Sequence, residues 1–261
     1  MNDIAKLHLV ATSNADALGY QAQQAVAKAM GDSTNYRLIG GHMVRLLLGI
    51  YPSSRAVVRS TLDADAAVEQ VVVIAPVAQD LMGHGFMKVR SNAFTKKTAD
   101  GQTLEVNLLL SRTGPKPGLR TQTVEGVGQV DTLPELDFAL NNPGLLVDVT
   151  AEISTTVVIH YKIRIPSLEA AVVLKAHAWH QRRASKDLAD LYSLFEIRQE
   201  HGEVSWKLDA PQLMGRRMDA ARILRPLADR IIKRHPEIEM PPAVDRIRMS
   251  ALIKQHIATP G

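Results

Sequence analysis

The sequence of 261 residues contains no cysteine. It can therefore form no disulfide, no thiolate metal site and no cysteine nucleophile, which is typical of proteins of the reducing cytoplasm. No apolar run approaches the ~18 residues that a membrane-spanning helix needs. The N-terminus also lacks a basic segment followed by an apolar stretch, the pattern of a signal peptide. We therefore expect a cytoplasmic protein with no membrane partner.

Apolar residues make up 46% of the chain and charged residues 22%, which is the composition of a soluble globular protein. The length suits one large domain or two modest ones, because domains usually run ~100 to 200 residues. A chain of this size can bury a hydrophobic core without disulfides or structural metals.

The formal net charge is only +4, but it is unevenly distributed. From residue 210 to residue 261 there are ten Lys or Arg against five Asp or Glu, a net +5, so the remainder sums to −1. A basic region on a near-neutral body suggests an anionic partner such as nucleic acid. Ordinary solvated helix faces would give the same count, and the sequence leaves both interpretations open.

Before residue 166 the sequence predicts a mixture of strands and helices. An alanine-rich and glutamine-rich run predicts a surface helix over residues 16–30 with Asp16 as its cap. A short strand, a glycine turn and a helix follow over residues 37–50. Residues 112–131, rich in glycine, proline and basic residues, predict a long loop. Runs of β-branched residues predict strands at 55–61, 70–76, 103–111 and 155–165, with a short helix at 77–87.

After Pro166 the pattern becomes helical, and we place a domain boundary there. Helices are predicted over residues 167–183, 185–199, 211–235 and 243–257. The expected fold class is α+β, with a mixed sheet and flanking helices in residues 1–166 and a C-terminal helical bundle in residues 167–261.

A glycine pair and a carboxylate pair lie within residues 36–65. Gly40 and Gly41 lack Cβ atoms, so backbone N–H groups at the start of the following helix can approach an anion closely. On a strand, side chains at i and i+2 share a face, so Asp63 and Asp65 should project together with Thr61. Two converging carboxylates repel unless a cation lies between them, and Mg²⁺ suits such a pair. The combination is what a nucleoside triphosphate with bound Mg²⁺ requires.

Each half of this pattern has an ordinary alternative: a glycine pair in a simple turn and two solvated carboxylates. A third acid on a neighbouring strand would complete the metal site and could accept a proton from an incoming hydroxyl. Glu105 and Asn107 share one face of the strand predicted over residues 103–111. We select Glu105 because it is anionic. If Asn107 occupies that place instead, a neutral ligand has replaced an acid and the general-base step is in doubt.

Two sequence patterns carry a family resemblance. The stretch "IGGHMVRLL" followed by "RSTLDAD" resembles the GG…R-x-S/T-x-D-x-D signature of the AbiEii/MenT family of nucleotidyltransferase toxins, members of the DNA polymerase β-like nucleotidyltransferase superfamily. The later "LKAHAWHQRRASKDLADLYSL" resembles that family's second signature, a helix with lysine and arginine followed by a K-D-x-x-D-L helix start. Together they span residues 36–194.

The resemblance implies a role for each matching residue. Gly40 and Gly41 would form the triphosphate-binding turn with Thr61 beside it, and Asp63, Asp65 and Glu105 would be the catalytic metal ligands. In the helical domain, which is expected to contribute to the active site, Lys175 and Arg182 would contact phosphate and Asp187 would hold them. His177 and His180, three residues apart, have a spacing that can also bind zinc, but no third ligand is near in the sequence.

The implied function is that of a nucleotidyltransferase toxin in a toxin-antitoxin system. Such an enzyme would use Mg²⁺ to transfer a nucleoside monophosphate from an NTP to RNA, in relatives the tRNA 3′ end, and so block translation. A cognate antitoxin protein would restrain it. Two alternatives remain: a small-molecule nucleotidyltransferase of the antibiotic-modifying kind, and a catalytically silent nucleotide-binding regulatory protein. The basic C-terminal region favours RNA over a small acceptor.

Overall fold

The computed structural model describes residues 4–114 and 118–261, which form two compact units. The first unit comprises the chain up to Leu46 together with Arg59–Pro166, and the second comprises Leu47–Val58 and Ser167–Gly261. The predicted boundary after Pro166 coincides with a division between units, but the segment Leu47–Val58 belongs with the C-terminal helices.

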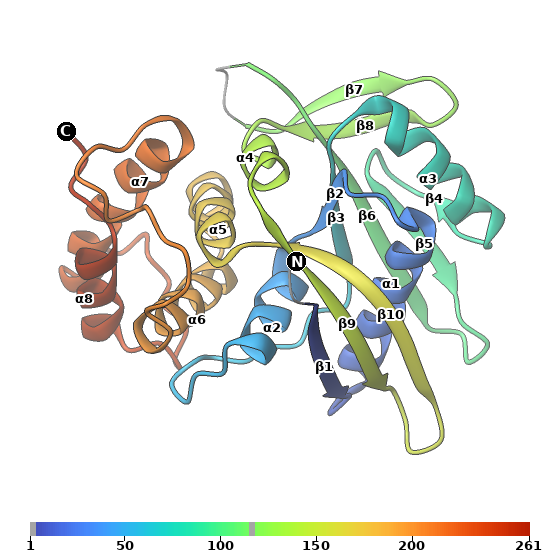
Figure 1. The fold of residues 1–261 in the computed structure, drawn as a ribbon, viewed down its shortest axis with the longest axis horizontal. Coiled ribbons are helices and arrows are strands. Elements are labelled where there is room, and N and C mark those ends of the chain that lie inside the picture. Colours follow the sequence, from blue (N-terminus) through green and yellow to red (C-terminus); the bar gives the residue numbers. More distant parts are fainter. Residues whose placement is uncertain (1–3, 115–117) are drawn as a thin grey trace. The chain divides into compact units, whose positions relative to one another are not determined.

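The first unit contains a three-stranded and a seven-stranded sheet (Figure 1). In the smaller sheet the order is β1-β9-β10, with β1 parallel and β10 antiparallel to β9. In the larger sheet the path is β2-β3-β6-β5-β4, and β8 pairs with both β6 and β7. The β3–β6 and β6–β8 pairs are parallel and the others are antiparallel, so the expected mixed sheet is confirmed. The strands are β1 (Ala5–Val10), β2 (Tyr36–Leu38), β3 (Ala64–Val68), β4 (Met87–Lys88), β5 (Ala93–Lys97), β6 (Thr103–Ser111), β7 (Arg120–Val124), β8 (Gly128–Leu133), β9 (Gly144–Glu152) and β10 (Val158–Pro166).

Helix α1 (Asn14–Met30) contacts strands of both sheets of this unit. Ser13 caps it by accepting a hydrogen bond from the backbone N–H of Asp16, so the prediction of Asp16 as the cap is wrong. The expectation of a surface helix is also wrong. Leu18, Tyr20 and Val26 are buried, so this helix is part of the core.

Two segments rich in β-branched residues are not strands. Residues 55–61 have no regular structure, and the backbone N–H and C=O of Val57 bond the hydroxyl of Ser193 instead of a neighbouring strand. The residues predicted as a strand at 70–76 and a helix at 77–87 lie mainly in one helix, α3 (Val71–Gly83). Its buried residues, Ile74, Val77, Ala78 and Leu81, recur with helical spacing, and this burial prevails over β propensity.

The segment predicted as a long loop contains the β7–β8 hairpin. Gly126 and Gly128 have φ values of 73° and 86° at its turn, a conformation that glycine adopts without strain. Residues 115–117 of that predicted loop lie outside the described residues. The short helix α4 (Leu136–Asn141) then leads to β9.

The second unit is helical, as the sequence predicts. Its helices are α5 (Leu168–Arg182), α6 (Ser185–Glu200), α7 (Gly215–Ile232) and α8 (Arg246–His256), and α2 (Gly40–Ile50) extends into it from the first unit. α5 and α6 are buried along most of their lengths. In the described part of the chain, no helix combines the length and the apolar character that crossing a membrane requires.

Candidate active site

The glycine pair begins α2 directly after strand β2. β2 pairs with β3, and the backbone N–H of Ile39 donates to the carbonyl of Asp65 at 2.8 Å. Gly40 has φ 72°, and a Cβ at this position would collide with the carboxylate of Asp65. A Cβ on Gly41 would collide with the hydroxyl of Thr61. Glycine is therefore needed at both positions to bring the turn against the segment that carries the carboxylates.

Asp63 and Asp65 lie where the chain enters β3, with Asn107 of the parallel strand β6 beside them. Asp65 is the register partner of Asn107. The side-chain amide of Asn107 donates to Asp65 Oδ1 at 3.0 Å and contacts Asp63 Oδ2 at 3.4 Å. The amide oxygen of Asn107 faces Asn92 Nδ2 at 3.4 Å. The structure thus brings both aspartates onto one amide, which lowers their mutual repulsion.

Glu105 lies on the same strand as Asn107, two residues earlier. Its carboxylate accepts a hydrogen bond from Arg90 Nη2 at 2.9 Å. Within residues 4–114 and 118–261, no three His, Cys, Asp or Glu side chains are grouped to hold a metal ion. The role of Glu105 as third ligand therefore stays a prediction, and it would require the pair with Arg90 to open.

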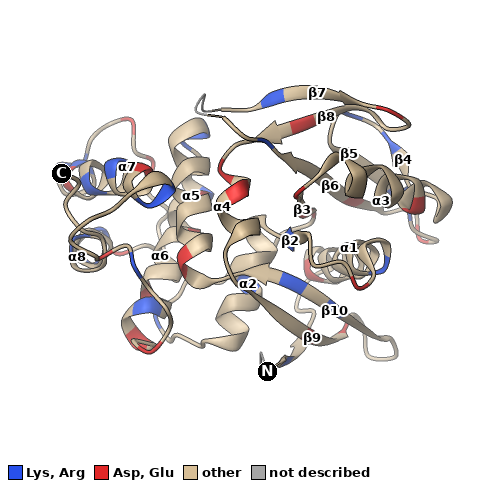
Figure 2. Cartoon of the chain, turned by 45° about the horizontal axis from the view of Figure 1, so that its top comes forward, with Lys and Arg blue, Asp and Glu red and all other residues tan. Residues whose placement is uncertain are grey.

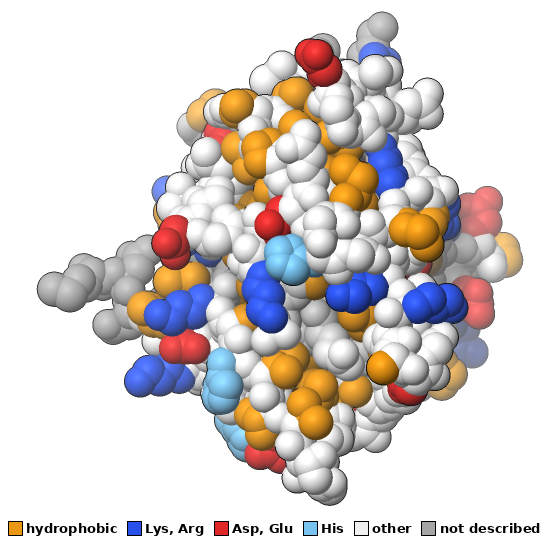
Figure 3. Space-filling model, turned by 90° about the vertical axis from the view of Figure 1, so that its right-hand side faces the viewer, with side chains coloured by type: hydrophobic (Ala, Val, Ile, Leu, Met, Phe, Trp, Pro, Cys, Tyr) orange, Lys and Arg blue, Asp and Glu red, His pale blue; other side chains and the backbone are white. Residues whose placement is uncertain are grey.

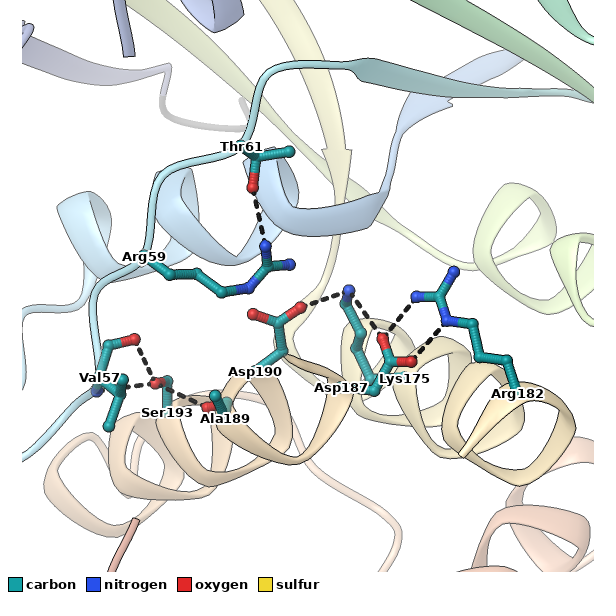
Figure 4. A network of polar contacts seen from close by, with 9 residues as sticks. All are labelled: Val57, Arg59, Thr61, Lys175, Arg182, Asp187, Ala189, Asp190 and Ser193. Atoms are coloured by element: carbon teal, nitrogen blue, oxygen red, sulfur yellow. Dashed lines mark hydrogen bonds and ion pairs between the residues drawn. The ribbon is translucent and has the colours of Figure 1, made fainter. Parts of the chain in front are cut away.

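Arg59 and Thr61 of the R-x-S/T-x-D-x-D pattern contact each other. Arg59 Nη1 donates to Thr61 Oγ1 at 3.1 Å (Figure 4). Arg59 Nη2 also lies near the position that a Cβ of Gly41 would occupy. A guanidinium and a hydroxyl therefore flank the glycine turn, and both suit phosphate oxygens.

In the second unit, four charged side chains form one cluster across α5 and α6. Lys175 Nζ lies 2.5 Å from Asp190 Oδ2 and 3.4 Å from Asp187 Oδ1. Arg182 forms a fork on Asp187, with Nε and Nη2 each 2.6 Å from one carboxylate oxygen (Figure 4). Lys175, Asp187 and Asp190 are almost completely buried, whereas the Arg182 side chain is half exposed. Asp187 thus contacts both cations that the second signature contains.

Chain geometry at the α5–α6 junction explains this fork. α5 ends because Arg183 adopts the left-handed conformation, with φ 53°. Two residues, Arg183 and Ala184, connect α5 to α6, so Asp187 in the first turn of α6 lies beside Arg182 at the end of α5. Ala184 occupies the cap position, and Ser185 is the first residue of the helix.

Residues 35–257 match the protein family described as "Nucleotidyl transferase AbiEii toxin, Type IV TA system". The chain belongs to this AbiEii family. The match covers most of the sequence and confirms the resemblance carried by the two signatures. Membership makes the protein a nucleotidyltransferase of a toxin-antitoxin family and implies an NTP substrate and an antitoxin partner.

Three solved structures show a distant likeness to this AbiEii family member. An antigenic nucleotidyltransferase-like protein from Paracoccidioides brasiliensis is 15% identical, with a TM-score of 0.45 and 96% of each chain covered. The antibiotic-resistance factor ANT(2'')-Ia is 11% identical, with a TM-score of 0.39 over 85% of this chain and 98% of that one. The CD-NTase CdnG of Bradyrhizobium diazoefficiens, in complex with GTP, is 13% identical, with a TM-score of 0.27 over 92% and 83%. No curated protein matches the chain. The family assignment rests on the sequence match alone.

The histidines at positions 177 and 180 do not gather a zinc site in this AbiEii protein. Both lie on α5, where His177 is buried and His180 is exposed. They belong to no group of three metal-ligating side chains in the described part of the chain. The structure therefore offers no support for the zinc alternative.

Helix α7 contains several arginines, and Figure 2 colours their positions blue. Much of this charge is engaged within the second unit. Arg217 bonds the carboxylate of Glu169, and Arg230 pairs with Glu237 at 2.7 Å. Arg225 donates to three oxygens, on Lys254, Ile257 and Thr259. Arg222, Lys233 and Arg234 are exposed and make no ion pair among the described residues.

Four residues near these clusters received no role from the sequence: Arg90, Asn92, Asp190 and His42. Arg90 and Asn92 reach the β6 residues from a segment 15 residues earlier. Asp190 stands in the second signature, and the three-residue spacing from Asp187 on α6 could have indicated a shared face. His42 directly follows the glycine pair, but nothing in the sequence distinguishes it from a core residue.

Proposed function

We propose that this AbiEii family protein transfers a nucleoside monophosphate from an NTP to RNA, with the tRNA 3′ end as the acceptor. The observation that carries this proposal is the fit of the glycine turn against the carboxylate segment. Gly40 lies so close to the Asp65 carboxylate, and Gly41 so close to the Thr61 hydroxyl, that a Cβ at either position would collide with these groups. This close fit supports the proposal that the turn binds phosphate beside two carboxylates that would hold a divalent cation.

Asp63 and Asp65 would hold Mg²⁺. The residues fit this ion, because Mg²⁺ is commonly bound through one or two carboxylates together with substrate phosphates and water. When bound, the ion would neutralise phosphate charge and favour deprotonation of the acceptor hydroxyl. Asn107 holds the two carboxylates in place through its amide, at 3.0 Å and 3.4 Å. A carboxamide can also turn its oxygen towards a cation, and the Asn92 amide would then have to turn its own oxygen towards the Asn107 NH₂ group.

The backbone N–H groups at the start of α2 would bind the triphosphate, and Thr61 and Arg59 would bond its oxygens. Arg182 is half exposed and can contribute further positive charge. Lys175 is buried between Asp187 and Asp190, so we assign it to electrostatic support of the reaction, with Asp187 holding both cations. Glu105 would accept the proton of the acceptor hydroxyl after release from Arg90.

RNA is the proposed acceptor because exposed basic side chains remain on the second unit. Arg222, Lys233 and Arg234 project from or follow α7 and can track a phosphate backbone. A tRNA 3′ end offers the free hydroxyl that the chemistry needs, and its extension would block aminoacylation and translation. The enzyme would act in the cytoplasm, where tRNA is found.

A second candidate is a catalytically silent nucleotide-binding protein. The specific observation that favours it is Asn107, a neutral side chain in contact with both aspartates. Release of pyrophosphate separates the two candidates, because a silent protein would bind NTP without cleaving it.

The direct test is to incubate the protein with each labelled NTP, Mg²⁺ and total RNA, and to resolve the products on a gel. Labelling of tRNA by the unsubstituted protein, together with no labelling by Asp63→Asn, would support the proposal. In cells, controlled expression followed by sequencing of tRNA 3′ ends tests the acceptor. Unaltered tRNA ends in growth-arrested cells would exclude it.

A further inference from the structure

His42 is a buried residue of the first unit to which the proposed function gives no role. It directly follows Gly41 in α2 and is 2% exposed. Its Nδ1 lies 2.9 Å from Gln23 Nε2 on α1. Its Nε2 is buried and has no hydrogen-bond partner. Leaving a buried polar group unpaired costs ~1–3 kcal/mol, so such a group in a native protein calls for an explanation.

A chain of hydrogen bonds determines where the imidazole carries its proton. Tyr161 OH, on β10, donates to Gln23 Oε1 at 3.1 Å, which turns the Gln23 NH₂ group towards His42. An amide NH₂ can only donate, so His42 Nδ1 must accept. Burial lowers the pKa of His42 to about 4, so the ring is neutral near pH 7. The neutral ring then carries its proton on Nε2, the atom without a partner.

The Nε2 edge of the ring faces the segment that leads to the aspartates. Gly19 of α1 has no Cβ, and both the His42 ring edge and the carbonyl oxygen of Thr61 lie against the place where a Cβ would be. Asp63 also acts electrostatically on the ring. An N–H donor without a partner and a backbone carbonyl therefore share one small space beside Gly19.

We propose that His42 is a positioning residue of the nucleotide site. Its Nε2–H binds the carbonyl of Thr61 when the triphosphate is bound, and so holds the segment carrying Thr61 and Asp63 against the glycine turn. Tyr161 and Gln23 act through His42 by fixing its tautomer. This inference rests on the proposed function, because it assigns His42 to the same site.

Two substitutions separate this role from simple core packing. In His42→Gln the amide nitrogen can take the place of Nε2 and keep the donor. In His42→Asn the shorter amide can keep the contact with Gln23 but cannot reach Thr61. A positioning role requires the Nε2 donor, so Gln should restore what Asn loses. A packing role requires the Gln23 contact, so it predicts that His42→Asn would lose less than His42→Gln.

The experiment measures NTP binding, kcat, KM and thermal stability for the full chain and both variants. We expect His42→Gln to keep near-normal values, and His42→Asn to lose at least ~10-fold in kcat/KM, equivalent to ~1.4 kcal/mol, with little change in Tm. A His42→Asn variant as active as the unsubstituted protein, or equal losses in both variants, would overturn the inference.

A second measurement uses the unsubstituted protein and so does not depend on whether the variants fold. Nitrogen NMR of the labelled imidazole reports the tautomer directly, and we expect the proton on Nε2. A proton on Nδ1, or a charged ring at pH 7, would overturn the inference by itself. Failure of the unsubstituted protein to bind any NTP would instead refute the proposed function, so this outcome can be told apart from refutation of the role of His42.

Discussion

The two units place acidic side chains in opposite electrostatic settings. In the first unit, Asp63 and Asp65 converge on Asn107, a neutral amide. In the second unit, Asp187 and Asp190 are buried beside Lys175 and the half-exposed Arg182, so two negative charges meet two positive charges. Repulsion between the first pair falls when a cation binds, whereas the second cluster is balanced by its own residues. One set of carboxylates is therefore suited to bind a metal ion and the other to hold the fold.

The comparison predicts its largest effect on stability in the second unit. Asp187→Ala removes the carboxylate that both Lys175 and Arg182 contact, so the buried Lys175 keeps the Asp190 carboxylate and the half-exposed Arg182 loses its forked partner. We expect the free energy of unfolding to fall by ~3 kcal/mol, the upper end of the range for losing hydrogen bonds to charged groups. Urea denaturation measures it. The matched control is Asp63→Asn, whose stability should be unchanged or slightly higher; a larger loss for Asp63→Asn would reverse the comparison.

Acid sensitivity in the first unit should come from His42. Its pKa is lowered to about 4 from 6.5, so the unfolded chain takes up the proton first as the pH falls. The neutral buried ring makes its full contribution to the free energy of unfolding above pH 6.5. This contribution is lost progressively as the pH falls to 4, by roughly 3 kcal/mol in total. Unfolding curves between pH 7.5 and 4.5 should show this decline in the unsubstituted protein and a shallower one in His42→Gln. Parallel declines would show that other groups cause it.

Substitution of the two carboxylates proposed to bind the metal should have the largest effect on activity. Asp63→Asn keeps the shape of the side chain but removes one negative charge from the proposed Mg²⁺ site. We expect transfer to fall by at least ~10²-fold, the scale seen when one preorganised electrostatic contact is lost. Single-turnover assays at several Mg²⁺ concentrations provide the measurement. Near-normal turnover would mean that these two carboxylates do not hold the catalytic metal.

The third-acid position can be assigned by contrasting two neighbours on β6. If Glu105 accepts the proton, Glu105→Gln should reduce kcat by ~10²-fold or more, whereas Asn107→Ala should reduce it by about 10-fold through looser aspartates. The opposite ranking would assign the third position to Asn107. Arg90→Ala serves as the control, because it frees the Glu105 carboxylate without removing it.

The sequence predicted those parts of the fold in which a local pattern and burial agree. The strand over residues 103–111 and the C-terminal helices were predicted because their spacing repeats over many residues. β1 and β9 were missed because their stability comes from pairing across the chain, with Ala5 opposite Val147. α3 was misassigned because its valines favour strands when burial is ignored.

The candidate site shows the same limit. Two glycines and two aspartates could be selected from their spacing, because strand and helix geometry relates near neighbours. The hydrogen bonds that link Tyr161 through Gln23 to His42 could not be predicted from spacing, because Tyr161 and Gln23 are 138 residues apart. The pair between Arg90 and Glu105 likewise depends on how the chain returns beside β6, which no local pattern specifies.

The smallest predicted effect concerns RNA binding, and it follows from the distinction between engaged and unengaged charges. Substituting Arg225 or Arg230 would break bonds within the second unit, so their loss could not be read as lost RNA contact. Arg222, Lys233 and Arg234 are exposed and free of ion pairs among the described residues, so their reversal to Glu tests the surface without disturbing the core. Each phosphate contact contributes ~0.7–0.9 to the slope of log K against log salt concentration, so the triple variant should bind tRNA with a slope smaller by about two.

The matched control reverses three exposed lysines of the first unit, Lys6, Lys28 and Lys162, with the same change in net charge. Equal slopes for the two triple variants would show that net charge alone governs binding. An unchanged slope and full activity in the Arg222, Lys233 and Arg234 variant would remove α7 and the residues after it from the RNA-binding surface.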